Sequence, residues 1–397
     1  MRVCMFTNTY RPHVGGVARA VETLEQEARA AGHAVQVIAP GFPGDEHEPD
    51  GDVLRVPAIQ RFNGSDFSVR VPVPRVIAHR IDAFGPDLIH THHPFLLGDA
   101  ALRIAYERNL PLVFTHHTLY ENYTHYVPFD SQTLKRFVIR LATEYANCCD
   151  AVIAPSGSVA RLLRARGVTV PVEAIPTGID TRAAAEADGA AFRRARGLPR
   201  DARVIGHVGR LAREKNLPYL ARAVAGALRR DPAMWFLLVG DGPESRALKQ
   251  LFAAEGVSGR VLATGKLTGR TLRDAYAAMD LFAFASRTET QGMVLAEAMA
   301  AGLPVVALDG PGVRDVVADG HNGRLLPADA PVAEMARVLR EAARGSDRAR
   351  WRRAALETAA GLDRVRCARR VFELYRTLRA GRRASPDWGW WDRLLGR

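Results

Sequence analysis

Short apolar runs rich in β-branched residues alternate, in the first half of the chain, with longer segments whose apolar residues recur at helical spacing. The pattern predicts five strands in this half: Arg2–Thr7, Ala34–Ala39, Asp87–Thr91, Leu112–Thr115 and Ala151–Ala154. Amphipathic helices are expected between them, among others over Val17–Ala31 and Thr133–Asn147. Strands that alternate with helices indicate a parallel sheet.

The second half repeats the same rhythm. Its predicted strands are Val204–Val208, Trp235–Val239, Val261–Ala263, Leu281–Phe284, Pro304–Ala307 and Gly323–Leu325. The helices expected between or after them are Leu217–Arg230, Gly269–Met279, Met293–Ala301 and Val332–Ala343. We therefore expect an α/β protein with two Rossmann-like, doubly wound domains.

Proline and glycine interrupt the pattern between the two halves, in the segment Ile175–Asp180, which is the natural hinge. We expect domains over 1–180 and 181–362. Ligands of open parallel sheets bind beyond the carboxyl ends of the strands. Two such sheets joined by a hinge would leave a cleft, with a site built from the loops that follow strands in both halves.

Composition agrees with this organisation. The chain has 397 residues, of which 47% are hydrophobic and 25% charged, as in a globular protein of two domains. No run reaches the roughly 18–20 apolar residues of a membrane-spanning helix. The opening Met1–Val3 leads directly into a strand, so we expect a cytoplasmic protein. Four cysteines without CxxC spacing are interpreted as buried thiols: Cys4, Cys148, Cys149 and Cys367.

The net charge of +12 is concentrated at the carboxyl end. Against four acidic residues, the segment 363–397 holds ten arginines: Arg364, Arg366, Arg369, Arg370, Arg376, Arg379, Arg382, Arg383, Arg393 and Arg397. Three tryptophans, Trp388, Trp390 and Trp391, interleave with the last of them. Aromatic and basic residues together favour a membrane interface, whereas the alternatives are a solvated, disordered or self-packed tail.

Several polar and glycine residues follow predicted strands. Gly15 and Gly16 precede the first helix, whose amino-terminal N–H groups could approach an anion or a sugar hydroxyl, although a simple tight turn explains them equally. Gly209 and Arg210 follow a strand, and Lys215 stands five residues after Arg210 near the start of a helix. Two cations beside helix amides suit a diphosphate whose charge grows as it leaves.

The most informative segment is Ser286–Glu297. Glu289 stands before a predicted helix and Glu297 stands within it, with Gly292 between them allowing close approach of the backbone. Carboxylates near a helix amino terminus are stabilised and can accept hydrogen bonds from sugar hydroxyls. Spacing alone would also fit two solvated glutamates.

In its wider context this segment resembles the retaining glycosyltransferase family 4, which has the GT-B fold. The resemblance includes Thr-Glu-Thr-Gln-Gly (288–292), Glu-Ala-Met-Ala-Ala-Gly-Leu-Pro-Val-Val (297–306) and the upstream Gly-Arg and Lys-Asn pairs (209–210, 215–216). It extends to Phe-Thr-Asn-Thr-Tyr-Arg-Pro (6–12), Gly-Gly-Val (15–17), Ile-His-Thr-His (89–92) and Thr-His-His-Thr (115–118). The segment 115–126 is most similar to glycosyltransferases that glucosylate diacylglycerol.

The resemblance implies roles for individual residues. It assigns four residues to catalysis: His117, Arg210, Lys215 and Glu289. It assigns nine residues to donor binding: Gly15, Gly16, Gly209, Lys266, Leu267, Gln291, Gly292, Met293 and Glu297. By the same resemblance the last helix crosses back to the first domain, which places 363–397 apart as a crossover helix and a basic, aromatic tail.

Within these sets the roles differ. Arg210 and Lys215 match the pair that holds the donor pyrophosphate, Glu289 the acid that holds the transferred sugar, and Glu297 the acid that binds the ribose. Lys266 and Leu267 fall where family members contact the base, and the amides of 291–293 where they contact the sugar. Gly15 and Gly16 match the loop near the phosphate and the acceptor. His117 matches the active-site histidine, and because the histidine is doubled, His116 is the alternative.

Neither metal-like motif is interpreted as a metal site. His90, His92 and His93 have no nearby carboxylate except Asp99, and Asp50-Gly51-Asp52 lies in a turn far from the pyrophosphate pair. The expectation is metal-independent transfer without a cofactor, in which the leaving phosphate helps to remove the acceptor's proton and no protein nucleophile acts.

UDP-glucose is the first expectation for the donor, with UDP-galactose and GDP-mannose open. The acceptor expected is diacylglycerol or another lipid, and the alternative is a soluble glycan, polysaccharide or lipopolysaccharide. A peripheral contact with the anionic inner face of the plasma membrane is expected, and a contact with nucleic acid is not.

Two other classes of protein are less well supported by the sequence. A nucleotide-binding dehydrogenase would need a GxGxxG motif, which is not present, and a basic binding module would not need the paired acids and cations.

Overall fold

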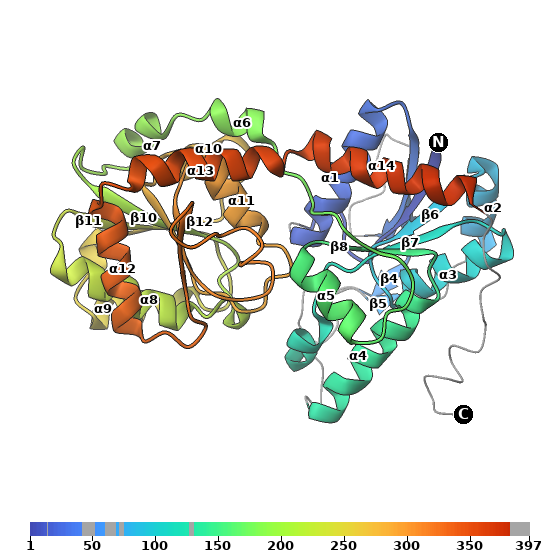
Figure 1. Ribbon diagram of the computed structural model, residues 1–397, viewed down its shortest axis with the longest axis horizontal. Coiled ribbons are helices and arrows are strands. Elements are labelled where there is room, and N and C mark those ends of the chain that lie inside the picture. Colours follow the sequence, from blue (N-terminus) through green and yellow to red (C-terminus); the bar gives the residue numbers. More distant parts are fainter. Residues whose placement is uncertain (14, 42–51, 60–68, 71–74, 127–130, 382–397) are drawn as a thin grey trace. The chain divides into compact units, whose positions relative to one another are not determined.

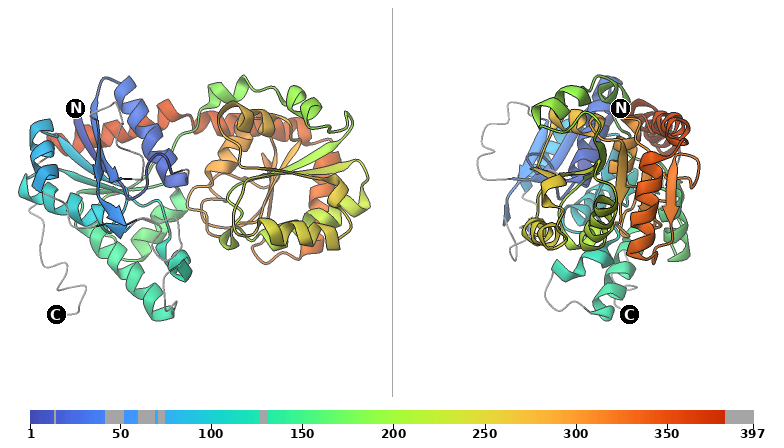
Figure 2. Two further views of the ribbon diagram at one scale, coloured as in Figure 1. Left: turned by 180° about the vertical axis from the view of Figure 1, so that it is seen from behind. Right: turned by 90° about the vertical axis from the view of Figure 1, so that its left-hand side faces the viewer.

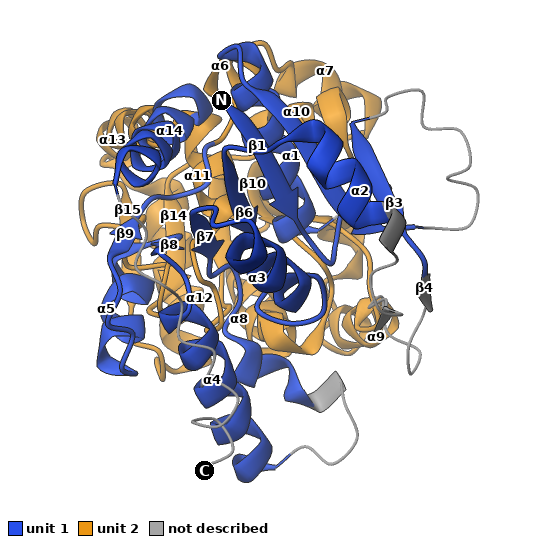
Figure 3. Ribbon diagram, turned by 90° about the vertical axis from the view of Figure 1, so that its right-hand side faces the viewer, with its two compact units in different colours: residues 1–178, 364–397 blue, residues 179–363 orange. Residues whose placement is uncertain are grey.

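The computed structural model describes residues 1–13, 15–41, 52–59, 69–70, 75–126 and 131–381. The chain forms two compact units (Figure 3). Unit 1 comprises Met1–Gly178 and Arg364–Arg397, and unit 2 comprises Ile179–Asp363. The chain thus leaves unit 1 after Gly178 and returns to it at Arg364.

Unit 1 is built on a parallel sheet with the strand order β3-β2-β1-β6-β7-β8-β9 (Figure 1). Its strands are β1 (Arg2–Phe6), β2 (Ala34–Pro40), β3 (Val53–Val56), β6 (Leu88–Thr91), β7 (Leu112–Thr115), β8 (Ala151–Ala154) and β9 (Val172–Ala174). Beside them stands a short antiparallel pair, β4 (Ala58–Ile59) and β5 (Val69–Arg70). Its helices are α1 (Gly16–Ala30), α2 (Arg75–Phe84), α3 (Leu97–Glu107), η3 (Tyr120–Tyr126), α4 (Gln132–Asn147), α5 (Gly157–Ala165) and α14 (Arg364–Ala380).

Side chains of β1 show why this sheet needs helices on both faces. Cys4 and Phe6 pack into a core formed with helices α3, α4 and α5. Val3 and Met5 point the other way, into a core shared with α1 and α14. Both faces are therefore apolar, as in parallel sheets covered on two sides, and this explains why the strands appear in the sequence as continuous apolar runs.

Unit 2 repeats this architecture with the strand order β12-β11-β10-β13-β14-β15, again all parallel. Its strands are β10 (Arg203–Val208), β11 (Met234–Val239), β12 (Val261–Gly265), β13 (Leu281–Phe284), β14 (Val305–Leu308) and β15 (Gly323–Leu326). Its helices are α6 (Thr181–Ala185), α7 (Gly189–Ala195), η4 (Arg213–Lys215), α8 (Leu217–Arg230), α9 (Ser245–Ala254), η5 (Ser258–Arg260), α10 (Gly269–Ala277), α11 (Met293–Ala300), α12 (Val332–Arg344) and α13 (Arg348–Gly361).

Helix α14 completes unit 1, although it follows unit 2 in the sequence. It lies beside α1 (Figure 2), where Arg364 Nε is 3.0 Å from Glu27 Oε1. Its buried face, which includes Phe372 and Tyr375, belongs to the same core as Val3 and Met5 of β1. The expectation that the last helix crosses back to the first domain is confirmed.

The two crossing segments run side by side. A Cβ atom at Gly178 would lie 2.1 Å from Cα of Arg364, so only glycine allows this approach. One residue further on, Ile179 pairs with Asp363 and its N–H donates to the carbonyl of Leu362 at 2.9 Å. The chain therefore enters and leaves unit 2 at one place.

The two-sheet α/β fold expected from the sequence is confirmed, and the predicted strands coincide with observed ones to within two residues at either end. The pattern did not reveal β3, β9 or the β4–β5 pair. Each of these strands forms because a neighbouring strand offers hydrogen bonds, which the local pattern does not show.

Candidate active site

The donor-binding residues expected in unit 2 lie in loops at one edge of its sheet. Gly209, Arg210 and Lys215 follow β10, and Lys266 and Leu267 follow β12. The segment from Glu289 to Met293 follows β13 and leads into α11. All of these strands are parallel, so their carboxyl ends share an edge, the edge at which such sheets bind ligands.

Lys215 and Glu289 meet at this edge although 74 residues separate them. Lys215 Nζ donates to Glu289 Oε1 at 2.5 Å, and both side chains are largely buried. Burial raises the pKa of Glu289. The Lys215 ammonium, a hydrogen bond from Ser286 and nearby His207 together lower it by more than burial raises it, so the net shift of this pKa is downward. Glu289 is therefore an ionised carboxylate held by a cation.

The turn between Glu289 and helix α11 depends on two glycines. Gly292 stands just before the helix with φ +75°, a left-handed conformation that favours glycine. A Cβ atom at Gly312, also at positive φ, would lie 2.6 Å from the carbonyl carbon of Thr290. The backbone of 290–292 thus packs tightly on a second loop and brings the positive end of α11 to the site.

Glu297 lies within α11 and has a partner that the sequence did not reveal. The buried Tyr276 of α10 donates its hydroxyl hydrogen to Glu297 Oε2 at 2.8 Å. This bond fixes the orientation of the carboxylate. Tyr276 occupies a position of its helix that the sequence marks only as apolar, so nothing in the pattern distinguished it from a core residue.

Three further predicted residues lie at the same edge. Arg210 and Lys266 are exposed, and Leu267 packs on the edge of the core below. Gly209 is covered by the loop after β11, because a Cβ atom at Gly240 would lie 1.9 Å from the Gly209 carbonyl oxygen.

His207 is a further buried neighbour of the pair that the sequence analysis did not single out. Its Nδ1 lies 3.0 Å from the carbonyl oxygen of Ala283, so this nitrogen carries the hydrogen. Burial lowers the pKa of His207 to about 4, which keeps the ring neutral.

In unit 1, a pocket opens at the carboxyl ends of β6, β7 and β8. His90, His92, Thr115 and His117 line it, together with residues of α1, of 175–178 and of α14. His90 hydrogen-bonds through Nε2 to Thr115 Oγ1 at 2.7 Å, and through Nδ1 to Tyr375 OH at 2.5 Å. Helix α14 thus forms one wall of the pocket and fixes one of its histidines.

The two adjacent histidines after β7 point to different surroundings. His117 lines the pocket, and its Nε2 lies 2.9 Å from His92 Nδ1. His116 is buried against Phe114 and Tyr120. Of the two histidines, His117 is therefore the one that lines the pocket.

The remaining predicted features of unit 1 are a turn, thiols and metal-like motifs. Gly15 caps α1 and Gly16 is its first residue. The cysteines are free thiols, three of them buried and Cys148 half-buried. Of the Asp-Gly-Asp motif only Asp52 lies within the described residues, where it pairs with Arg29 at 2.8 Å.

The described residues contain no group of three or more histidine, cysteine or acidic side chains that could hold a metal ion. None of the helices in the same residues is long and apolar enough to span a bilayer. The tryptophans of the tail lie outside the described part of the chain.

Two parallel Rossmann-like sheets in one chain are the architecture of the GT-B fold. Residues 14–183 match the profile of Glycosyltransferase Family 4, and residues 202–344 that of Glycosyl transferases group 1. The chain is 30% identical to alpha-monoglucosyldiacylglycerol synthase of Streptococcus pneumoniae, over 82% of this chain and 75% of that protein. It is 31% identical to a GDP-mannose-dependent alpha-mannosyltransferase of Mycobacterium tuberculosis, over 82% of this chain and 84% of that protein.

Solved structures agree on the fold. HepE of Anabaena in complex with UDP-glucose superposes with a TM-score of 0.74 over 95% of this chain and all of that one, at 22% identity. Sucrose-phosphate synthase of Thermosynechococcus elongatus superposes with a TM-score of 0.76 over 95% of this chain and 98% of that one, at 22% identity. The chain belongs to glycosyltransferase family 4, a retaining family, and is a nucleotide-sugar-dependent glycosyltransferase.

Proposed function

We propose that this glycosyltransferase transfers a hexose, glucose in the first place, from a nucleoside diphosphate to a lipid acceptor such as diacylglycerol. The carrying observation is the ion pair of Lys215 and Glu289, which concentrates a cation and a hydroxyl-binding carboxylate at the ligand edge of unit 2. The choice of glucose and lipid is supported by the relatives from Streptococcus pneumoniae and Acholeplasma laidlawii, both alpha-monoglucosyldiacylglycerol synthases and both 30% identical to this chain.

We assign donor binding to unit 2. Arg210 and Lys215 hold the pyrophosphate, the amides of 291–293 at the start of α11 face the sugar, and Glu289 accepts from its hydroxyls. Glu297, oriented by Tyr276, binds the ribose. In the absence of donor the charges of Lys215 and Glu289 neutralise each other, and a bound donor offers each of them a new partner: phosphate for the ammonium and hydroxyls for the carboxylate.

The reaction keeps the anomeric configuration, and we propose the following course. The acceptor oxygen forms its bond to the anomeric carbon on the face from which the phosphate leaves, and the leaving phosphate takes the acceptor's proton. The cations stabilise the negative charge that develops on the diphosphate. We propose that transfer is metal-independent, because Arg210 and Lys215 supply this positive charge.

We assign acceptor binding to unit 1, which contains His117, and propose that Gly15 and Gly16 lie near both the donor phosphate and the acceptor. The second candidate acceptor is a glycan, and the second candidate donor is GDP-mannose, favoured by the relatives that are mannosyltransferases.

The test supplies purified protein with UDP-glucose, UDP-galactose or GDP-mannose, each with diacylglycerol in mixed micelles or with a soluble oligosaccharide. We expect a monoglucosyldiacylglycerol by mass spectrometry, with the small anomeric proton coupling of an α-linkage. Transfer from GDP-mannose alone, or to the oligosaccharide alone, would replace this proposal with the corresponding candidate. Lys215→Ala serves as the matched control for a contaminating activity.

The basic, aromatic end of the chain is proposed to bind the anionic surface that presents the acceptor. Removing residues 381–397 takes away four arginines and three tryptophans, so binding to phosphatidylglycerol vesicles in a flotation assay should fall. Turnover of detergent-dispersed diacylglycerol should stay unchanged, because none of the deleted residues is assigned to either site. Undiminished flotation would rule out the tail as the anchor.

A further inference from the structure

His92 is wedged between two other histidine rings of the unit 1 pocket. Its ring centroid lies 4.2 Å from that of His90 and 5.2 Å from that of His117. His90 is held at both ring nitrogens, by Tyr375 and Thr115. The His92 side chain is 1% exposed, so it keeps this orientation and presents Nδ1 to His117 Nε2 at 2.9 Å.

The two facing nitrogens share one hydrogen. Burial lowers the pKa of His92 and of His117 well below the usual value for histidine, so both rings are neutral. A neutral imidazole has one N–H and one bare nitrogen. Either His92 donates from Nδ1, or His117 donates from Nε2, and each choice fixes the hydrogen on the far nitrogen of both rings.

The far nitrogen of His92 decides between the two arrangements. His92 Nε2 is buried and has no hydrogen-bond partner among the described residues. If His117 donated, His92 Nε2 would carry a buried, unpaired N–H group; if His92 donates, Nε2 is an unpaired acceptor. Among backbone groups, a buried N–H group without a partner is rarer than a buried acceptor without one. The same cost of desolvation applies to the His92 ring and favours the arrangement in which His92 donates from Nδ1.

We propose that His92 is a positioning residue: it donates from Nδ1 to His117 Nε2 and thereby holds His117 as the Nδ1–H tautomer. His117 Nδ1 then carries a hydrogen, so this nitrogen is a hydrogen-bond donor and not a base. This fits a reaction in which the leaving phosphate takes the acceptor's proton. The consequence for catalysis rests on the proposed function of the pocket, whereas the tautomer is a property of the protein alone.

The tautomer is measured directly, without substrate. Long-range proton–nitrogen correlation spectra of the full chain, labelled with ¹⁵N-histidine, distinguish a protonated from a bare ring nitrogen, and His117→Gln identifies the His117 signals. We expect His117 with hydrogen on Nδ1 in the unaltered protein. A spectrum with the hydrogen on Nε2 would overturn the inference.

Two variants test whether the His92 donor holds His117 in the Nδ1–H tautomer. His92→Phe keeps an aromatic ring between His90 and His117 but removes the donor, so His117 should lose its single tautomer and turnover should fall about tenfold, the effect of one hydrogen bond. His92→Asn places an amide N–H near the position of Nδ1 and should restore the Nδ1–H tautomer and most of the turnover. An unchanged His117 tautomer in His92→Phe would overturn the inference.

The same data separate this inference from the proposed function. If the His117 tautomer changes in His92→Phe while kcat and KM stay as in the unaltered protein, the positioning role stands and the assigned role of His117 in transfer fails. If His117→Gln abolishes turnover but His92→Phe alters neither tautomer nor kcat, the transfer role stands and the inference fails.

Discussion

Lys215 and Glu289 depend on each other for their charges. Without the ammonium, the remaining large influence on Glu289 is burial, which raises its pKa and favours the neutral acid. Without the carboxylate, the ammonium would lack its partner in a largely buried place. This mutual dependence makes the pair sensitive to single substitutions.

For Lys215→Ala we expect turnover to fall about 100-fold or more, because one charge-stabilising donor to the leaving diphosphate is lost. The acidic limb of the profile of kcat/KM against pH should also move to higher pH, since Glu289 then takes up its proton more readily. Initial rates over a pH series measure both effects.

Lys249→Ala is the matched control, because Lys249 is exposed on α9 and is not among the residues assigned to the site. It should leave rate and profile unchanged. A Lys215→Ala enzyme with normal turnover would remove Lys215 from the catalytic group.

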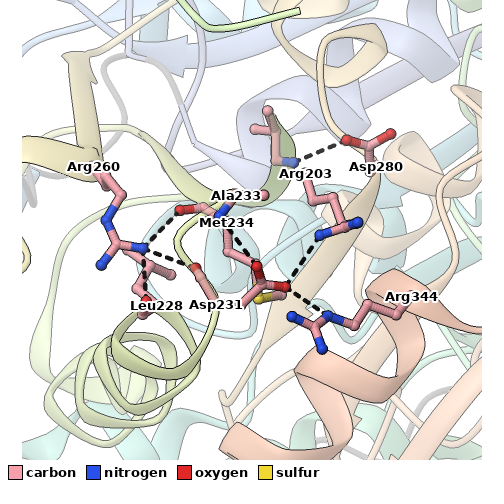
Figure 4. A network of polar contacts seen from close by, with 9 residues as sticks. Arg203, Leu228, Asp231, Ala233, Met234, Arg260, Asp280 and Arg344 are labelled. Carbon is pink, nitrogen blue, oxygen red and sulfur yellow. Dashed lines mark hydrogen bonds and ion pairs between the residues drawn. The ribbon is translucent and has the colours of Figure 1, made fainter. Parts of the chain in front are cut away.

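At the scale of elements, Asp231 joins three segments of unit 2 through one buried carboxylate (Figure 4). Its Oδ2 accepts from Arg203 of β10 at 3.3 Å and from Arg344 at the end of α12 at 2.8 Å. Its Oδ1 accepts from the backbone N–H of Ala233 at 3.1 Å. Arg260 binds the adjacent carbonyls of Leu228 and Asp231, so the turn between α8 and β11 is held from both sides.

Asp231→Asn should reduce the free energy of unfolding by about 1.5–3 kcal/mol at pH 7, the range for hydrogen bonds to charged groups. The hydrogen bond from Arg344 lowers the pKa of Asp231 below its ordinary 3.8. A carboxylate with a lowered pKa stabilises the fold above the unfolded pKa, and the contribution is lost as pH falls through the folded value. The difference between the two proteins should therefore be full at pH 7 and shrink below about pH 3.8.

Urea unfolding at pH 7 and at a series of lower pH values measures this difference. Asp201→Asn is the control, because Asp201 is exposed in the loop before β10 and should change little. A difference for Asp231→Asn that is constant with pH would contradict the assignment to the charged form.

At the scale of the whole molecule, unit 1 is completed by residues that follow unit 2 in the sequence. Residues 364–380 supply α14, whose Phe372 and Tyr375 pack in the core with β1 and α1. The hydrogen bond between Tyr375 and His90 joins residues 285 positions apart. One wall of the unit 1 pocket thus comes from the other end of the chain.

Phe372 is 4% exposed, and Phe372→Ala should lower the stability of unit 1 by about 3–5 kcal/mol, as for other buried aromatic residues. Hydrogen exchange followed by peptide mass spectrometry should show faster exchange in β1, β2 and α1, while peptides of unit 2 stay as before. The control is Arg369→Ala, on the exposed face of the same helix. Equal acceleration in both units would show that α14 does not belong to unit 1 alone.

The sequence by itself determined the elements and the class of protein. Alternation between apolar runs and helical periodicity depends on neighbouring residues, so the strands and the two-sheet fold could be predicted locally. Glycines and charged residues just after strands placed the ligand edge, because parallel strands end at one edge. The motif around Glu289 and Glu297 was informative enough to indicate the family.

Only the tertiary structure decided which side chains meet. The partners Lys215 and Glu289, Tyr276 and Glu297, and His92 and His117 come from different segments, and strand order and helix packing bring them together. The sequence left His116 and His117 as alternatives, because a doubled histidine does not show which ring faces the pocket. Periodicity marks a residue as buried, but the hydrogen bond it makes there depends on what the rest of the fold places within about 3 Å of it.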